Sequence, residues 1–202
     1  MAVGLFVCSM GFLTAQVEVN STLTPEQYVN DVLLGTGVEA TNVVFTGSPV
    51  QIGEITGFDP DEFPIEAGLI LSTEVANNPA NVDDGCFTEF IDDNLEVSGD
   101  NDLLTIANSV PPLIGQNFSV GSVNDICAIE FDFVATGDTI RFNYVFGSDE
   151  YLAWVNSQYN DIFGFFLSGP GINGPYTDNA INLAEVPGSD PQLAITISSV
   201  NN

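Results

Sequence analysis

Basic residues are almost absent from this chain of 202 residues: Arg141 is the only one, and there is no lysine and no histidine. Without histidine, the chain cannot form a Ser-His-Asp or Cys-His catalytic group or a histidine-containing zinc site. Without lysine, it has no P-loop, no Schiff-base lysine and no Ser-Lys pair. Enzymatic chemistry is therefore restricted to carboxylates, as in a glycoside hydrolase.

The single basic residue is opposed by 28 acidic residues, which give a formal net charge of −27. Such a surface repels nucleic acid and anionic membranes. It attracts divalent cations and stays soluble in salty surroundings, where self-repulsion is screened. The simpler interpretation of this acidity is solubility in salt. A more specific interpretation, compatible with the first, is that some of the carboxylates bind Ca²⁺. We expect a folded chain rather than a disordered one, because 45% of the residues are hydrophobic.

Cysteine is also scarce, with three in the chain. Residues 1–16 are uncharged and mostly apolar, which is typical of the core and cleavage end of a signal peptide. The segment is too short to span a bilayer, and it lacks a basic start, so we expect the true start to lie upstream. Cleavage would remove Cys8 and leave Cys86 and Cys127, which suggests one disulfide in an exported protein. Two free buried thiols are the alternative.

One helix is expected near the N-terminus. Thr24, Pro25 and Gln27 provide an N-cap, a proline at the first helical position and a capping-box partner. The helix should end near Gly35. Its buried side should consist of Tyr28, Val29, Val32 and Leu33.

Short strands bounded by glycine and proline dominate the rest of the chain. Residues 126–134 and 139–146 should pair as antiparallel neighbours across the turn at Gly137-Asp138. Residues 103–110 could be a helix or a strand, which Pro111-Pro112 should end. Further strands are expected at residues 38–45, 67–73, 162–167, 180–186 and 193–200. The predicted fold is all-β: an antiparallel β-sandwich of jelly-roll type with one short N-terminal helix.

Two acidic turns bracket one loop between the strands at 139–146 and 162–167, and they form the main candidate site. Asp149, Glu150, Asn160 and Asp161 supply the hard oxygen ligands that suit Ca²⁺. The alternative is that these side chains only cap turns. A second, weaker cluster consists of Asp100 and Asp102, whose spacing resembles the start of a Ca²⁺ loop without its later ligands.

The same loop contains Tyr151, Trp154 and Tyr159. Exposed aromatic rings beside acids and amides are typical of sugar-binding surfaces. Alternatively, the rings fill the end of the sandwich.

Glu130 and Asp132 could be the acid and base of a glycoside hydrolase, since they share the outward face of one strand. A solvated strand face with one ion pair to Arg141 is the favoured interpretation.

The longest phrases of the chain are FNYVFGSDEY at residues 142–151 and NDIFGFFLSGPGI at residues 160–172. They resemble the choice-of-anchor L domain, whose members show F-x-Y-V-F-A-S-E-E-Y and then N-D-x-F-G-F-F-L-S-G-P-G-I. Gly147 and Asp149 are the departures. Similar phrases in order are LLGTGV, GLILST, GDNDL, IEFDFVATGD and NLAEVPGS, so the resemblance covers roughly residues 23–202.

The resemblance implies a protein secreted or displayed by a Gram-negative bacterium, with an anchor that varies between members. It also implies further strands, so we expect the domain of residues 17–202 to be C-terminally incomplete, with any anchor outside this chain. Our interpretation is a non-enzymatic surface domain for adhesion or binding of an extracellular ligand, such as a glycan, stabilised by Ca²⁺. The alternatives are a carboxylate-only glycoside hydrolase and a passive structural module.

Overall fold

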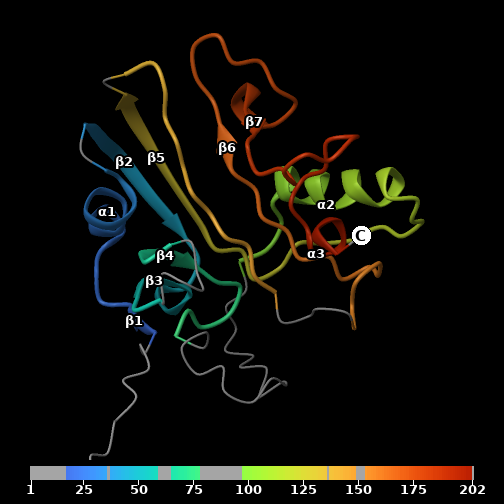
Figure 1. The fold of residues 1–202 in the computed structure, drawn as a ribbon, viewed down its shortest axis with the longest axis horizontal. Coiled ribbons are helices and arrows are strands. Elements are labelled where there is room, and N and C mark those ends of the chain that lie inside the picture. Colours follow the sequence, from blue (N-terminus) through green and yellow to red (C-terminus); the bar gives the residue numbers. More distant parts are fainter. Residues whose placement is uncertain are drawn as a thin grey trace, which may run out of the picture. The chain divides into compact units, whose positions relative to one another are not determined.

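The computed structural model describes residues 17–35, 37–58, 65–77, 97–135, 137–148 and 153–201 (Figure 1). They belong to two compact units. Unit 1 takes the chain up to Val44 together with Pro49–Ile91 and Glu130–Asp138, and unit 2 takes Phe45–Ser48, Asp92–Ile129 and Thr139–Asn202. The predicted signal peptide, residues 1–16, lies outside the described residues.

Unit 1 contains a three-stranded sheet in the order β1 (Glu18–Asn20), β3 (Ile52–Thr56), β4 (Ala67–Leu71). Both strand pairs are antiparallel. Ile52 and Ile55 of the central strand are buried. Gly53 admits β1 closely, because a Cβ there would lie 2.5 Å from Cγ1 of Val19.

The predicted N-terminal helix is confirmed. It begins as α1 (Pro25–Gln27), capped by Thr24 and Gln27 as expected, and continues as a wider π-helical segment, η1 (Tyr28–Leu33). The widening appears in the bond from Leu34 N to Val29 O, 2.9 Å long, which spans five residues. Tyr28 and Val29 are buried, and the Tyr28 hydroxyl donates to the carbonyl of Asn20 at 3.0 Å. The helix is thereby fastened to β1.

A second sheet pairs β2 (Val38–Thr46) with β5 (Ala128–Ala135), whose arrows point in opposite directions in Figure 1. The predicted alternation of β5 is confirmed, since Phe131 and Phe133 are half-buried while Glu130 and Asp132 are exposed. The predicted partner is wrong: β5 pairs with β2, and residues 139–146 form no regular strand.

The aromatic side chains of residues 139–146 explain this difference. Phe142 makes an edge-to-face contact with Phe165, at a centroid distance of 4.8 Å. Tyr144 lies 5.3 Å from the ring of Phe163. These contacts fix the segment by its side chains within unit 2.

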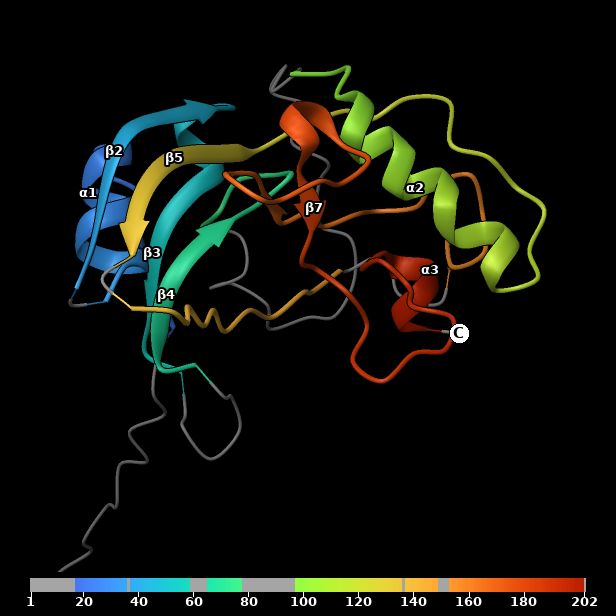
Figure 2. The ribbon, with the colours of Figure 1, turned by 90° about the horizontal axis from the view of Figure 1, so that it is seen from above.

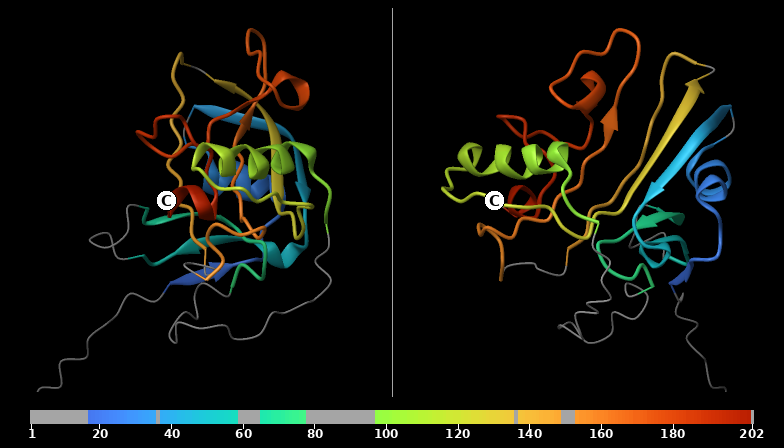
Figure 3. Two further views of the ribbon diagram at one scale, coloured as in Figure 1. Left: turned by 90° about the vertical axis from the view of Figure 1, so that its right-hand side faces the viewer. Right: turned by 180° about the vertical axis from the view of Figure 1, so that it is seen from behind.

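Unit 2 contains the long helix α2 (Asn101–Leu113), the short antiparallel pair β6 (Phe166–Leu167) and β7 (Ile181–Asn182), and the helix α3 (Ile197–Val200). Helices α2 and α3 lie side by side (Figures 2 and 3). The single-turn 3₁₀ segment η2 (Pro49–Gln51) belongs to unit 1, whereas η4 (Thr177–Asn179) belongs to unit 2. The core of this unit includes Ile106, Val110, Ala184, Ile195 and Ile197.

Four predicted boundaries in unit 2 are wrong. The strands expected at residues 162–167 and 180–186 are reduced to the two-residue strands β6 and β7. The strand expected at residues 193–200 gives way to α3, because Thr196 and Ser199 form a capping box that starts a helix. Helix α2 does not end before Pro111 and Pro112 but includes both in its last turn.

The described strands lie in antiparallel sheets with few helices, which confirms a β-rich fold. These sheets have three, two and two strands, so the complete jelly-roll sandwich stays a prediction. Within the ranges given above, no helix is long and apolar enough to cross a membrane.

Candidate binding loop

The predicted site residues are only partly within the described structure. Asp149, Glu150 and Tyr151 lie outside it, whereas Trp154, Tyr159, Asn160 and Asp161 lie within one loop of unit 2. We refer to residues 153–161 as the aromatic loop.

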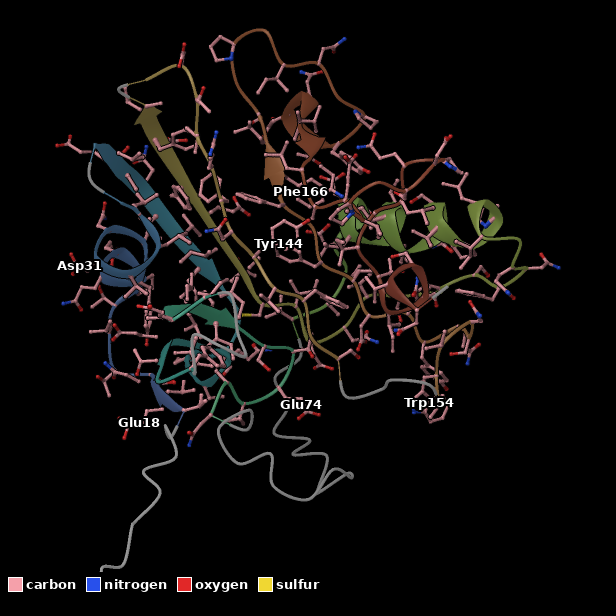
Figure 4. The ribbon with its side chains drawn as sticks, viewed as in Figure 1. Glu18, Asp31, Glu74, Tyr144, Trp154 and Phe166 are labelled. Carbon is pink, nitrogen blue, oxygen red and sulfur yellow. The ribbon has the colours of Figure 1, made fainter. Side chains whose placement is uncertain are left out.

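Trp154 and Tyr159 form an edge-to-face pair in the aromatic loop. Their ring centroids are 5.0 Å apart and their planes make an angle of 76°. Trp154 is 40% exposed and Tyr159 52% exposed, and the indole projects outward from the loop (Figure 4). Both rings are therefore open to solvent while holding one another in a defined geometry.

Asn160 joins the aromatic loop to both helices of unit 2. Its side-chain Nδ2 donates to the carbonyl of Ala107 in α2 at 3.2 Å. Its Oδ1 accepts from the backbone N–H of Ser198 in α3, also at 3.2 Å. With 7% of its surface exposed, this predicted metal ligand has both ends of its amide engaged by backbone groups.

A second group of bonds fixes the loop to the start of α3. The N–H of Asn156 donates to Oγ of Ser198 at 3.1 Å, with Asn156 in the left-handed region at a φ of 61°. The N–H of Ile197 donates to the carbonyl of Asp161 at 2.9 Å. The first amides of a helix have no partner within it, and here the loop supplies acceptors for two of them, those of Ile197 and Ser198.

Asp161 also connects the two acidic turns that the sequence singles out. Its Oδ2 accepts from the hydroxyl of Ser148 at 3.1 Å. Ser148 directly precedes Asp149 and Glu150. The bond therefore places the start of the first acidic turn next to the carboxylate of Asp161 in the second.

The second acidic cluster has structural partners. Asp100 is the N-cap of α2, and its Oδ1 accepts from the N–H of Leu103 at 2.8 Å. Asp102 accepts from the N–H of Thr177 at 3.0 Å. Among the described residues, no group of three or more Cys, Asp or Glu side chains could hold a metal ion.

Aromatic pairs that the sequence analysis did not identify form a group around β6 and β7. It consists of three separate ring pairs: Phe142 with Phe165, Tyr144 with Phe163, and Phe166 with Tyr176, whose centroids are 5.0 Å apart. Burial raises the pKa of Tyr176, and the charges of Asp102 and Glu185 add to the rise. The aromatic alternation of residues 142–146 and the Phe pair at 165–166 were the available signals.

The structure also places Asp132, a residue of the glycoside-hydrolase alternative, and Cys127, a residue of the expected disulfide. Asp132 accepts a hydrogen bond of 2.7 Å from the side chain of Asn42 in β2, as an exposed strand-face residue would. Cys127 is half-buried. Its expected partner Cys86 lies outside the described residues, so the disulfide stays a prediction.

Fold and loop together define a β-rich, strongly acidic domain that displays an aromatic pair. The family model of the choice-of-anchor L domain matches residues 16–202. The chain therefore belongs to the choice-of-anchor L domain family, as the resemblance implied. Membership suggests a secreted or cell-surface protein. No curated protein and no solved structure matches the chain.

Proposed function

We propose that this domain is a non-enzymatic binding module, secreted or displayed by a Gram-negative bacterium, that holds an extracellular glycan on Trp154 and Tyr159. The supporting observation is the exposed edge-to-face pair on a loop anchored by Asn156 and Asn160. Large exposed rings are costly to leave in water, and carbohydrate-binding surfaces use them to stack against the apolar faces of sugars.

The charge of the chain favours a neutral sugar. Arg141 is the only cation in the sequence, against 28 carboxylates. Sulfated sugars and uronates would meet repulsion and find almost no basic partner. A neutral pyranose needs only a ring to stack on and carboxylate or amide oxygens to accept its hydroxyl protons.

A fluorescence titration tests this proposal, because Trp154 is the only tryptophan in the chain. Neutral and sulfated oligosaccharides are added to the purified protein while Trp154 emission and heat of binding are recorded. We expect saturable binding of neutral oligosaccharides, and a loss of roughly tenfold or more in affinity for Trp154→Ala, since stacking on one ring contributes on the order of 1–2 kcal/mol.

Leu113→Ala provides the matched control, since Leu113 is exposed to a similar degree, 47%, on α2 of the same unit. It should bind like the wild type. If neither a neutral nor a sulfated glycan binds, the glycan proposal fails and a passive structural module becomes the better account.

We also propose that Ca²⁺ stabilises the turns that flank the aromatic loop, with Asp149, Glu150 and Asp161 as its carboxylate ligands. The bond from Ser148 to Asp161 supports this, because it draws the two turns toward each other. Asn160 is left out of the ligand set, since backbone groups engage both ends of its side chain.

Thermal unfolding with Ca²⁺ and with EDTA, at fixed high ionic strength, tests the metal. A specific site predicts stabilisation that saturates with Ca²⁺ and is lost in Asp161→Asn. Asp178→Asn is the control, because Asp178 is an exposed acid of the same unit in the left-handed region, which asparagine tolerates. Equal Ca²⁺ responses in both variants would mean general charge screening and would contradict the site.

A further inference from the structure

The place of Asn160 is explained by a proline in α2. In an α-helix the carbonyl of residue 107 accepts from the N–H of residue 111, but residue 111 is Pro111 and has no N–H. Ala107 and Pro111 are both buried, so water cannot easily satisfy this carbonyl. The side-chain amide of Asn160 donates to it instead. A buried polar group that would be costly to leave unpaired is thus satisfied by the aromatic loop.

The other end of the same side chain meets a second orphan group. The N–H of Ser198 lies in the first turn of α3, where amides have no helical partner, and Oδ1 of Asn160 accepts from it. The hydroxyl of Ser198 then accepts from the N–H of Asn156. The loop is therefore held at Asn156 and at Asn160, the two positions that bound residues 157–159.

We infer that Asn160 is the positioning residue of the aromatic pair, holding Trp154 and Tyr159 as a preformed surface before a ligand arrives. Tyr159 is its direct neighbour, and Trp154 precedes the second anchor, Asn156, by two residues. A preformed surface avoids the cost of ordering a loop on binding. The inference rests on the proposed glycan function for its benefit, but the positioning itself can be measured without any ligand.

The test compares Asn160→Ala with Asn108→Ala. Asn108 is a matched control because its side chain also bridges α2 to another segment, donating to the carbonyls of Leu104 and Val120 and accepting from the N–H of Val120. It makes no such bond to the aromatic loop. Loss of either side chain should lower overall stability, whereas only Asn160→Ala should release the loop.

Two ligand-free readouts report the loop. Hydrogen exchange at the Asn156 amide should accelerate on the order of tenfold in Asn160→Ala beyond the change in globally protected amides, because the loop opens locally. Acrylamide quenching of Trp154 should rise as well. In Asn108→Ala both readouts should follow global stability alone. Equal behaviour of the two variants would overturn the inference.

Ser198→Ala keeps the test decisive where Asn160→Ala does not fold. It removes the acceptor for Asn156 and leaves the Thr196 cap in place. Exchange at Asn156 should again accelerate, and unchanged exchange would overturn the inference. Glycan affinity is measured last: we expect a roughly three- to tenfold loss in Asn160→Ala, because its two lost hydrogen bonds leave a loop that binding must order again. If the wild type binds no glycan, the proposed function fails while the exchange result still decides the positioning role.

Discussion

Unit 1 and unit 2 differ in the kind of hydrogen bond that stabilises each of them internally. Unit 1 uses a regular backbone ladder, in which all five residues of β3 pair with β4. Unit 2 has strands of two residues and relies on side chains that bond to the backbone, among them Asn108, Asn160, Asn182, Thr196 and Ser199. A ladder tolerates most side chains, whereas a side-chain network depends on particular residues. Unit 1 should therefore be most sensitive to lost apolar volume, and unit 2 to small polar changes.

The largest expected effect lies in unit 1. Tyr28→Ala removes a ring that is 1% exposed together with the hydroxyl that bonds to Asn20. We expect a loss of about 3–5 kcal/mol in the free energy of unfolding, by analogy with other buried aromatic residues. Tyr28→Phe should lose only about 1 kcal/mol. Urea unfolding followed by circular dichroism measures both, and equal losses would mean that the hydroxyl dominates over the ring.

The next effect lies in unit 2 and arises from one methyl group. A Cβ at Gly174 would overlap the carbonyl oxygen of Ala180, which accepts from the N–H of Tyr176. Gly174→Ala should cost about 2–3 kcal/mol, because the backbone must move. Gly121→Ala meets no atom within 4 Å and should stay within about 0.5 kcal/mol of the wild type. Unfolding followed by Trp154 fluorescence separates the two, and a stable Gly174→Ala would show that this turn can relax.

The two capping boxes compare the units directly. Thr24 caps α1 at an exposed position, while Thr196 caps α3 with 0% of its surface exposed. Thr24→Ala should cost about 1 kcal/mol. Thr196→Ala should cost about 2 kcal/mol, because buried donors lose their acceptor as well. Similar shifts in thermal unfolding for both variants would contradict the distinction between the units.

The smallest effect is the response to alkaline pH. Burial raises the pKa of Tyr28 above 10.0, with a contribution from Glu54 and a partial offset from a backbone hydrogen bond, and burial likewise raises the pKa of Tyr176. The folded state thus favours the neutral phenols. This stabilisation is fully present below the unfolded pKa of about 10 and is lost as the pH rises through the folded values. Stability measured from pH 8 to 11 should fall less steeply in Tyr28→Phe, and an unchanged slope would exclude Tyr28 as a cause.

Local signals account for the parts of the fold that could be predicted. The helix at Thr24 follows from four adjacent residues, and the alternation of β5 follows from its own period of two. The partner of β5 could not be predicted, because a hairpin with residues 139–146 satisfies the same local rules. Side-chain contacts of Phe142 and Tyr144 with residues more than fifteen positions away decide against it.

In the candidate site, too, local sequence signals predict some features and contacts between distant residues decide the others. The sequence picks out Trp154, Tyr159 and Asn160 as functional residues, because aromatic and polar residues gather between strands. It does not reveal the backbone partners of Asn160, because one of them, Ala107, lies 53 positions away. The rule that proline ends a helix also conceals the link between Pro111 and Asn160. Pro111 stays in the last turn of α2 and leaves the Ala107 carbonyl without a helical donor.

Pro111 has a consequence for anyone who transplants the aromatic loop into another scaffold. Residues 153–161 moved alone would lose the carbonyl that Asn160 serves, since a host helix without proline already fills that position with its own amide. The transferred loop would keep its aromatic side chains but would lack the hydrogen bond that anchors it. Pro111 and Asn160 therefore have to be transferred together. A substitution at either position would change the rigidity of the aromatic pair without changing Trp154 or Tyr159.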